Sequence, residues 1–255
     1  IPAPRPPPGR RDETLPVPPR RTCQVEGVGQ VSIRPSNLRI RPDPAPCAHE
    51  TRYGAATTRK YMADLVRMQR DLDRNDLKGA ARAALQATQR CPEHPKAYGL
   101  AGCIYEKLAL ASGTLQSKPL QFALSSHQSC LAHTKEDTHE WALAACSAYN
   151  ALKLLRQVDP VQAVRLTEGH EWLTNRAVLL HTAERATSAA PEMSEAWAMR
   201  GDAACDGLFA SIAGLFFQRA AATATDDAVR REYLERANAT EAQASTRMSE
   251  ARIGR

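Results

Sequence analysis

The 255-residue sequence has few aromatic residues, only 5% of the total, and no apolar run long enough to cross a membrane. A transmembrane helix needs about 20 consecutive apolar residues, so we expect no membrane span. Alternation of apolar and polar residues, the pattern of strands, is almost absent. Alanine is abundant, and glycine and proline are largely confined to joints between helical segments. These features predict an all-α protein.

Motifs of catalysis and cofactor binding are also missing. The chain has no GxxxxGKS/T, GxGxxG or GxSxG pattern, and its seven cysteines form neither a CxxC pair nor a Cys/His cluster at zinc spacing. Scattered cysteines favour buried helix-packing thiols in a reducing compartment. His127, His133 and His139 lie six residues apart, a spacing that does not put all three on one helix face, and we expect them in exposed loops. The sequence therefore predicts no catalytic residue, cofactor, metal site or small-molecule substrate.

Positive charge is concentrated at one end of the chain. Residues 1–60 contain eleven Lys/Arg and five Asp/Glu, whereas residues 61–255 contain twenty-three of each. Because phosphate contacts supply much of the affinity for nucleic acids, a neutral body argues against nucleic-acid binding there. A local basic patch on the body, or binding by the basic N-terminal segment, remains compatible with this balance.

Residues 1–56 are predicted to form an extended Pro/Arg-rich arm without an independent fold. Twelve of the seventeen prolines lie within residues 1–50, a composition typical of extended polyproline-like chains. One segment matches the PxxPxR pattern of SH3 ligands; alternatively, the arm lies along a neighbouring protein or in the groove of its own chain. The residues expected to contact a partner are Arg10, Arg11, Pro16, Pro19, Arg20 and Arg21.

Residues 77–108 indicate a helix, a proline turn and a second helix. Two small residues are followed by a proline, an aromatic residue, a glycine and a tyrosine, at Ala80, Ala87, Pro92, Tyr98, Gly102 and Tyr105. This order resembles the tetratricopeptide repeat (TPR) family. The resemblance implies a right-handed superhelix of antiparallel helix pairs, a TPR-like α-solenoid.

The same pattern recurs along residues 57–225, which we expect to form about four helix pairs. Two insertions, of nine and twenty-two residues, fall near 111–119 and 158–175, and Asp159-Pro160 is expected to begin a short helix in the second. Residues 226–255 are predicted to form a capping helix of about twenty residues and a short tail. The further matching positions are Trp141, Ala145, Pro191, Trp197, Gly201, Ala213, Phe217 and Ala220.

The resemblance also implies a function in protein binding, since such repeats grip a peptide or a subunit in a groove lined by the first helix of each pair. The groove positions would be Gly99, Cys103, Ala142, Cys146, Ala198 and Asp202. These residues are small and non-basic, so the clamp for acidic C-termini found in one TPR subgroup is absent. A close-packed helix or extended segment would fit such a groove.

The hypothesis that follows is a non-catalytic scaffold or accessory subunit that contacts other protein subunits through the groove and the arm. The sequence does not begin with Met, which fits removal of a leader and a mitochondrial location, otherwise a cytoplasmic one. The expected host is a mitochondrial respiratory-chain or ATP synthase complex. The alternatives are a subunit of the mitochondrial ribosome, an RNA-binding helical repeat, and a freestanding peptide-binding adaptor with an SH3-ligand tail.

Overall fold

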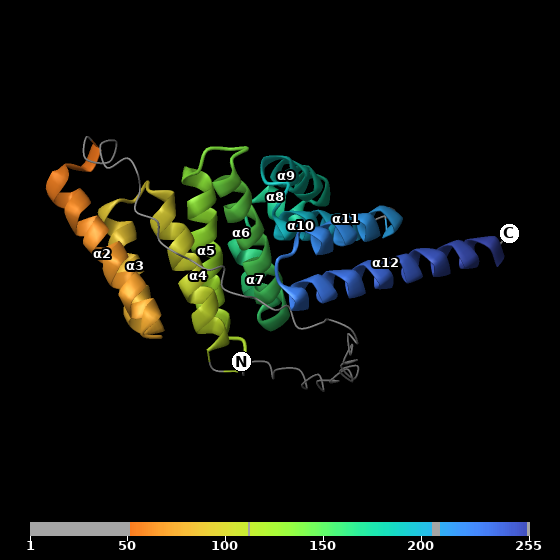
Figure 1. The fold of residues 1–255 in the computed structure, drawn as a ribbon, viewed down its shortest axis with the longest axis horizontal. Helices are drawn as coiled ribbons and strands as arrows, with labels where there is room; N and C mark the ends of the chain where they lie inside the picture. The colour runs from red at the N-terminus through yellow and green to blue at the C-terminus, as the bar shows by residue number, and fades with distance from the viewer. Residues whose placement is uncertain (1–51, 112, 206–209, 254–255) are drawn as a thin grey trace, which may run out of the picture. The chain divides into compact units, whose positions relative to one another are not determined.

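The computed structural model describes residues 52–111, 113–205 and 210–253 (Figure 1). In these residues every regular element is a helix, which confirms the all-α prediction. The predicted arm lies outside the described residues except for its last five, and α2 begins at Ala55, two residues before the predicted start of the repeats. The helices are α2 (Ala55–Asp73), α3 (Leu77–Arg90), α4 (Pro95–Leu110), α5 (Ser117–His133), α6 (His139–Val158), α7 (Pro160–Leu166), α8 (Glu171–Thr174), α9 (Arg176–Ala189), α10 (Ser194–Cys205), α11 (Ala210–Thr223) and α12 (Asp227–Ile253).

The helices pack in neighbouring pairs, as the sequence pattern predicted. The pairs are α2 with α3, α4 with α5, α6 with α9, and α10 with α11, and α12 packs on α11 (Figure 1). In the sequence, the short helices α7 and α8 come between α6 and α9, the two members of the third pair. Helix α7 packs on both α5 and α6. The right-handed superhelical course stays a prediction from the resemblance.

Alanine allows the first two pairs to pack closely. Ala80, Ala84 and Ala87 of α3 are fully buried against α2 and α4. Asp76 caps α3 by accepting a hydrogen bond of 2.9 Å from the Gly79 amide. Pro95 then occupies the first turn of α4, where its missing N–H is not needed. The local sequence therefore fixes where one helix ends and the next begins.

Two glycines on first helices receive aromatic rings from their partner helices. A methyl group added at Gly201 would lie 2.7 Å from the Phe217 ring, and one added at Gly102 would lie 2.3 Å from the His127 ring. The two contacts correspond in position once the nine-residue insertion is allowed for. His127 is therefore a buried packing residue of α5, only 1% exposed. The prediction that it lies in an exposed loop was wrong, because it occupies the position that the pattern gives to an aromatic ring.

The other two histidines are exposed, but they belong to helices. His133 is the last residue of α5 and His139 is the first residue of α6. The His133 ring stacks on Tyr98 at 5.9 Å between centroids. The three histidines therefore form no cluster.

A second repeated contact, between a tryptophan ring and an arginine guanidinium, occurs in both the third and the fourth helix pair. The guanidinium of Arg185 lies 4.9 Å from the centre of the Trp141 ring, and that of Arg219 lies 5.7 Å from the centre of the Trp197 ring. The partners are 44 residues apart in the third pair and 22 in the fourth. The difference equals the length of the predicted second insertion, so α7 and α8 are added with this tryptophan–arginine contact retained.

The inserted helix α7 begins as the sequence predicted. Asp159 accepts a hydrogen bond from the Gln162 amide at 3.1 Å and another from the Ser117 hydroxyl of α5 at 2.7 Å. At the other end of α7, the Gln128 side chain donates to the Leu166 carbonyl at 3.1 Å. These bonds attach both ends of α7 to α5.

The C-terminal helix is longer than expected, with 27 residues rather than about twenty. Asp226 caps it by accepting from the amides of Ala228 and Val229. Tyr233, Ala237 and Thr240 form its buried face, whereas Leu234 is exposed. Despite this length, none of the helices in the described part of the chain is apolar enough over a sufficient span to cross a membrane.

Candidate functional site

The predicted groove is largely closed at its predicted positions. Ala142, Cys146 and Ala198 are buried in the helix packing, and burial raises the pKa of the Cys146 thiol. Gly99 and Cys103 in α4 are partly exposed. The helix packing therefore covers the predicted groove at Ala142, Cys146 and Ala198, and the assignment of the six positions to a partner-binding groove stays a prediction. Ala142 and Cys146 belong to the largest core cluster, which extends from α4 to α10, whereas Ala198 packs with Ala220, Ala221 and Tyr233.

Asp202, the sixth groove position, is held by two cations of the same chain. Its carboxylate accepts from Lys153 of α6 at 2.6 Å and forms an ion pair with Arg236 of α12. The Arg236 guanidinium also lies 4.1 Å from the centre of the Phe217 ring. Burial lowers the pKa of Arg236 to about 10, so the side chain stays protonated at neutral pH. Asp202 thus joins α6, α10 and α12 and is not available to a partner peptide.

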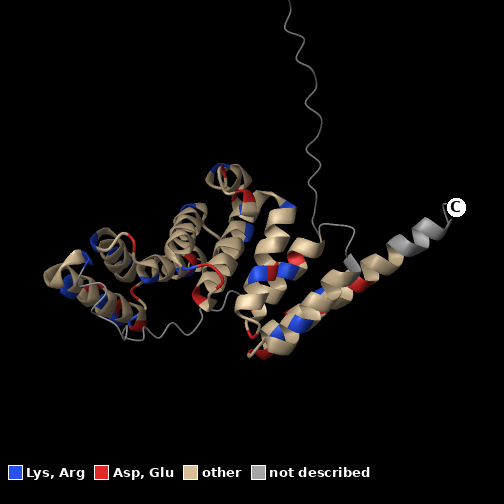
Figure 2. Ribbon diagram, turned by 90° about the horizontal axis from the view of Figure 1, so that it is seen from above, with Lys and Arg blue, Asp and Glu red and all other residues tan. Residues whose placement is uncertain are grey.

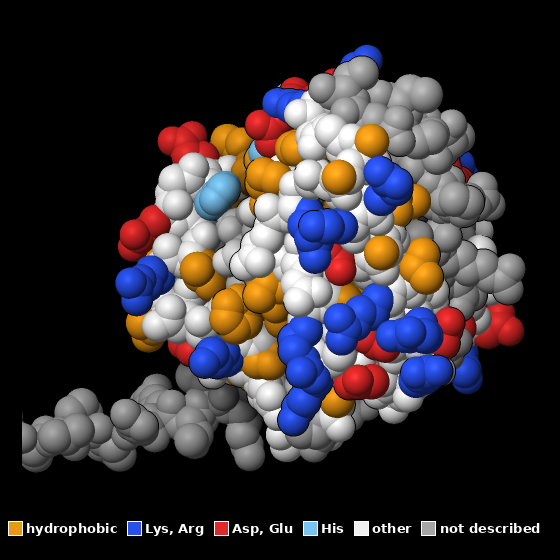
Figure 3. Space-filling model, turned by 90° about the vertical axis from the view of Figure 1, so that its left-hand side faces the viewer, with side chains coloured by type: hydrophobic (Ala, Val, Ile, Leu, Met, Phe, Trp, Pro, Cys, Tyr) orange, Lys and Arg blue, Asp and Glu red, His pale blue; other side chains and the backbone are white. Residues whose placement is uncertain are grey.

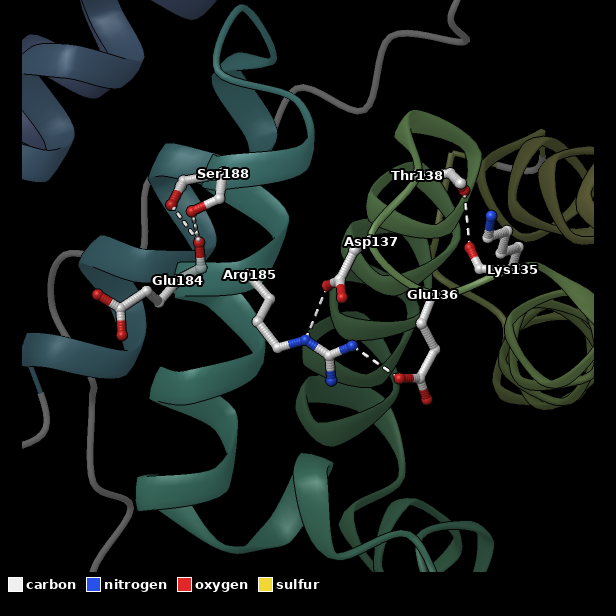
Figure 4. Close-up of polar contacts among 8 residues, drawn as sticks. Lys135, Glu136, Asp137, Thr138, Glu184, Arg185 and Ser188 are labelled. Atoms are coloured by element: carbon white, nitrogen blue, oxygen red, sulfur yellow. Dashed lines mark hydrogen bonds and ion pairs between the residues drawn. The ribbon is translucent and has the colours of Figure 1, made fainter.

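A shallow hollow of about 410 Å³ lies beside α9, lined in part by Asp137, His181 and Arg185. Arg185 reaches from α9 to the loop between α5 and α6, donating to Asp137 at 2.8 Å and to Glu136 at 2.7 Å (Figure 4). The hydrogen bond from Arg185 holds the pKa of the Asp137 carboxyl below its usual value. Asp137 has a positive φ of 59°, a conformation that Asp tolerates better than most residues.

The charged groups Asp137, Glu184 and Arg185 of this hollow already have ion-pair partners in the chain. The Arg185 guanidinium binds two carboxylates and covers Trp141, while Glu184 forms an ion pair with Arg200 at 2.8 Å. The described lining residues supply no nucleophile within hydrogen-bond distance of a base. The arrangement therefore ties α9 to the α5–α6 loop and does not form a binding site for an anion.

Three valines form an exposed apolar surface where α6 leads into α7. Val158 is 37% exposed, Val161 is 74% exposed and Val164 is 67% exposed. Ala163, on the opposite side of α7, is buried in the core. We call Val158, Val161 and Val164 the valine surface. Because both ends of α7 are hydrogen-bonded to α5, the valines are held outward by a fixed helix.

A second surface carries mostly positive charge. Charges of both signs are distributed along the helices (Figure 2), but Lys and Arg side chains gather on the side of the molecule where α2 lies (Figure 3). In residues 59–82 the exposed acidic residues are Asp73 and Asp76. The exposed basic residues of this stretch, which we call the basic face, are Arg59, Lys60, Arg67, Arg70, Arg74, Lys78 and Arg82. The neutral composition of the body concealed this local excess.

A cluster of metal-binding residue types lies between α4 and α5. The Cys103 sulfur, a Glu106 carboxylate oxygen and a His127 ring nitrogen all lie within 4.8 Å of one another. The His127 Nε2 is 3.1 Å from the Glu106 Oε1, and burial together with Glu106 raises the pKa of the Cys103 thiol to about 12. Sequence spacing gave no signal for this cluster, because His127 is 21 residues from Glu106 and on another helix.

No family model matches the chain, and no curated protein sequence matches it either. The TPR resemblance therefore rests on the sequence pattern and on the repeated contacts of the helix pairs. Function has to be argued from the surfaces that the structure presents.

Proposed function

We propose that this protein is a non-catalytic scaffold subunit of a large assembly and that the valine surface contacts a neighbouring protein subunit. The observation that carries this proposal is a fixed helix, α7, with three valines turned toward solvent. Scattered exposed apolar residues are ordinary. A group of three on an inserted segment, beyond what the helix pairs need for their own packing, indicates a contact with another molecule.

The energetics favour a protein partner for this surface. Complete burial of a valine side chain stabilises a complex by about 1.5 kcal/mol or more, and the centre of a protein interface is poor in charge. Val158, Val161 and Val164 are the apolar centre of such an interface. Arg165 and Glu168, both exposed, supply a polar edge.

Native purification of the tagged protein tests the proposal. We expect co-purification with other proteins at a fixed stoichiometry, and we expect the double variant Val161→Asp/Val164→Asp to lose them while its circular dichroism stays unchanged. The matched control is Val66→Asp on α2, where the side chain is 68% exposed. A wild-type protein that purifies as a monomer contradicts the scaffold proposal. An unchanged complex in the double variant contradicts the assignment of the valine surface.

The host named by the sequence analysis, a mitochondrial respiratory-chain or ATP synthase complex, stays a prediction. Mass spectrometry of the proteins that co-migrate with the native assembly identifies it. The adaptor alternative predicts a monomer that binds SH3 domains through residues 16–21, and an SH3-domain binding assay separates it from the scaffold.

The basic face favours a second candidate, an RNA-binding subunit of an assembly such as the mitochondrial ribosome. Exposed Lys and Arg along one helix pair suit a phosphate backbone. Reversing three of these charges, in Lys60→Glu/Arg74→Glu/Lys78→Glu, should weaken RNA binding and reduce the slope of log affinity against log salt by about 2. The control reverses three exposed charges elsewhere, in Lys118→Glu/Lys135→Glu/Arg165→Glu. Equal effects of the two triple variants contradict this candidate.

A further inference from the structure

We propose that Cys103, Glu106 and His127 bind a transition-metal ion between α4 and α5, and that Zn²⁺ is the ion that suits them best. The three ligand atoms already lie within 4.8 Å of one another. Cys103 and Glu106 are three residues apart on α4, so their side chains lie on the same face of that helix. His127 faces them from α5.

The backbone of α4 fixes the orientation of the His127 ring. Gly102 offers no side chain, and an added methyl group would lie 2.6 Å from either ring nitrogen. The ring therefore lies directly on the α4 backbone, with its Nε2 directed at Glu106. A histidine held in this way needs little rearrangement to bind a metal through Nε2, the nitrogen that already faces Glu106.

A comparison of the second and fourth helix pairs shows that this cluster is not needed for packing. At the position of His127 the fourth pair has Phe217, which lies on Gly201 as His127 lies on Gly102. The aromatic ring alone is sufficient there to fill the space between the two helices. The second pair instead has an imidazole with a thiol and a carboxylate beside it, three groups that bind metals.

The charges and donor atoms of the cluster match Zn²⁺. When the metal binds, the Cys103 thiol releases its proton and the sulfur forms the Zn–S bond, while Glu106 and neutral His127 donate through oxygen and nitrogen. One thiolate and one carboxylate neutralise the two positive charges of the ion, as a largely buried site requires. Thiolate and imidazole ligands select zinc over magnesium or calcium, which prefer oxygen.

The number of ligands leaves one position of a tetrahedral ion for water. Zn–S bonds are about 2.3 Å and Zn–N and Zn–O bonds about 2.0–2.2 Å, so the three side chains must close around the ion by small rotations. Cys103 is partly exposed as a residue, and we assign the fourth position to a water molecule. Cys130 lies outside the three-residue set, and its sulfur contacts the Thr134 hydroxyl at 3.9 Å.

Titration of the chelator-treated full-length protein with CoCl₂ tests the site, because Co²⁺ takes the place of Zn²⁺ and is visible by absorption. We expect one equivalent of Co²⁺ to give a thiolate-to-cobalt charge-transfer band and tetrahedral d–d bands, and one equivalent of ZnCl₂ to remove them. Zn²⁺ should also raise the melting temperature of the wild-type protein.

Three variants remove one ligand each: His127→Phe, Cys103→Ser and Glu106→Gln. Each should lower the Zn²⁺ affinity by more than about 100-fold, since loss of an outer-shell partner alone costs 10–100-fold. His127→Phe copies the packing of Phe217 on Gly201, so its circular dichroism should show a folded protein that Zn²⁺ no longer stabilises. Cys130→Ser is the matched control and should keep the cobalt spectrum.

Several results would overturn the assignment. One is a wild-type protein without the charge-transfer band, which would leave His127 and Glu106 as a structural hydrogen bond. A second is a band of unchanged intensity in His127→Phe or Cys103→Ser. Loss of the band in Cys130→Ser to the same degree as in Cys103→Ser would contradict the three-residue ligand set.

Discussion

At Gly201 the Phe217 ring leaves no room for a side chain. The ring carbons would lie 2.7–2.9 Å from an added methyl group, and the ring is itself held between α10, α12 and the Arg236 guanidinium. A rigid ring cannot withdraw as the end of a flexible side chain can. The glycine is therefore required by close packing, although it lies inside a helix.

We predict that Gly201→Ala destabilises the protein by about 1–3 kcal/mol, because overpacking outweighs the gain in helix propensity. Urea denaturation followed by circular dichroism measures the change. Gly214→Ala in α11 is the control, because the nearest atom to its added methyl group belongs to the flexible Glu241 side chain, at 3.3 Å. We expect Gly214→Ala to be neutral or stabilising, and a similar loss in both variants would contradict this explanation.

The ionised Asp137 carboxylate joins the α5–α6 loop to α9 by accepting a hydrogen bond from Arg185. Its pKa is held below 3.8, chiefly by the hydrogen bond from Arg185. A carboxylate with a depressed pKa in the folded state stabilises that state above its unfolded pKa, and the contribution disappears as the pH falls through the folded value. Arg185 stays protonated throughout this range.

We predict that Asp137→Asn reduces stability at pH 7 and that the difference from wild type shrinks as the pH falls below 3.8 toward the depressed pKa. Asn accepts the positive φ of this position, so the backbone is retained and only the charge is removed. Urea midpoints measured between pH 7 and pH 3 give the result. A difference that is independent of pH would show that the ion pair with Arg185 contributes nothing.

The start of the short helix α7 depends on the Asp159 side chain. Asp159 both caps the helix through the Gln162 amide and accepts the Ser117 hydroxyl of α5. The helix has only seven residues, too few to be stable without such contacts. The position of the valine surface therefore depends on this cap.

We predict that Asp159→Ala destabilises the protein by about 1 kcal/mol and increases hydrogen exchange in residues 160–166 above all. Asp159→Asn keeps an oxygen that accepts from the Gln162 amide and should lose less. Hydrogen exchange read by mass spectrometry distinguishes the two. Increased exchange across all helices in Asp159→Ala would show that the inserted segment supports the whole array.

The helices could be predicted from the sequence because their signals are local. Pro92, Pro95 and Asp159 mark helix ends, and the spacing of Ala80, Ala84 and Ala87 marks a buried face. The contents of the groove could not be predicted in this way. Whether Ala142 is open or buried depends on packing between helices that are distant in the sequence, because it lies in a core cluster that includes residues of α5, α9 and α10.

The proposed metal site could not be predicted from local sequence signals either. Helical periodicity places Cys103 and Glu106 on one face of α4, but nothing in it indicates that His127 of α5 turns toward them. The correspondence of His127 with Phe217 was the available signal. Comparing equivalent positions of the helix pairs would have identified a histidine in a buried aromatic position.

In the described part of the molecule, the more extensive contacts between helices that are not neighbours in the chain lie in the middle of the array: α4 with α6, α5 with α7, α6 with α9 and α6 with α10. The N-terminal core cluster of the described residues comes from α2, α3 and α4 together with Cys91 and the partly buried Tyr53. The largest cluster extends from α4 to α10, and the C-terminal clusters involve α9 to α12. Stability in such an array is approximately a sum of local terms. A substitution that destabilises the helices at one end should therefore leave the stability of the helices at the other end unchanged.

We predict that Met68→Ala, which removes a fully buried side chain of α2, costs about 2–5 kcal/mol and raises hydrogen exchange in α2, α3 and α4 but not in α11 and α12. The reciprocal variant Phe217→Leu should raise exchange in α10 to α12 and leave α2 and α3 unchanged. Uniform loss of protection in either variant would indicate a single cooperative unit.

The repeated contact of tryptophan with arginine has a practical consequence for optical measurements. The three tryptophans of the chain, Trp141, Trp172 and Trp197, belong to α6, α8 and α10. Two of them have a guanidinium over the ring. Tryptophan fluorescence therefore reports only the third and fourth helix pairs, whereas far-ultraviolet circular dichroism reports every helix. If the first two pairs melt separately, the ellipticity will begin to fall at a temperature where the emission spectrum is still that of the native protein.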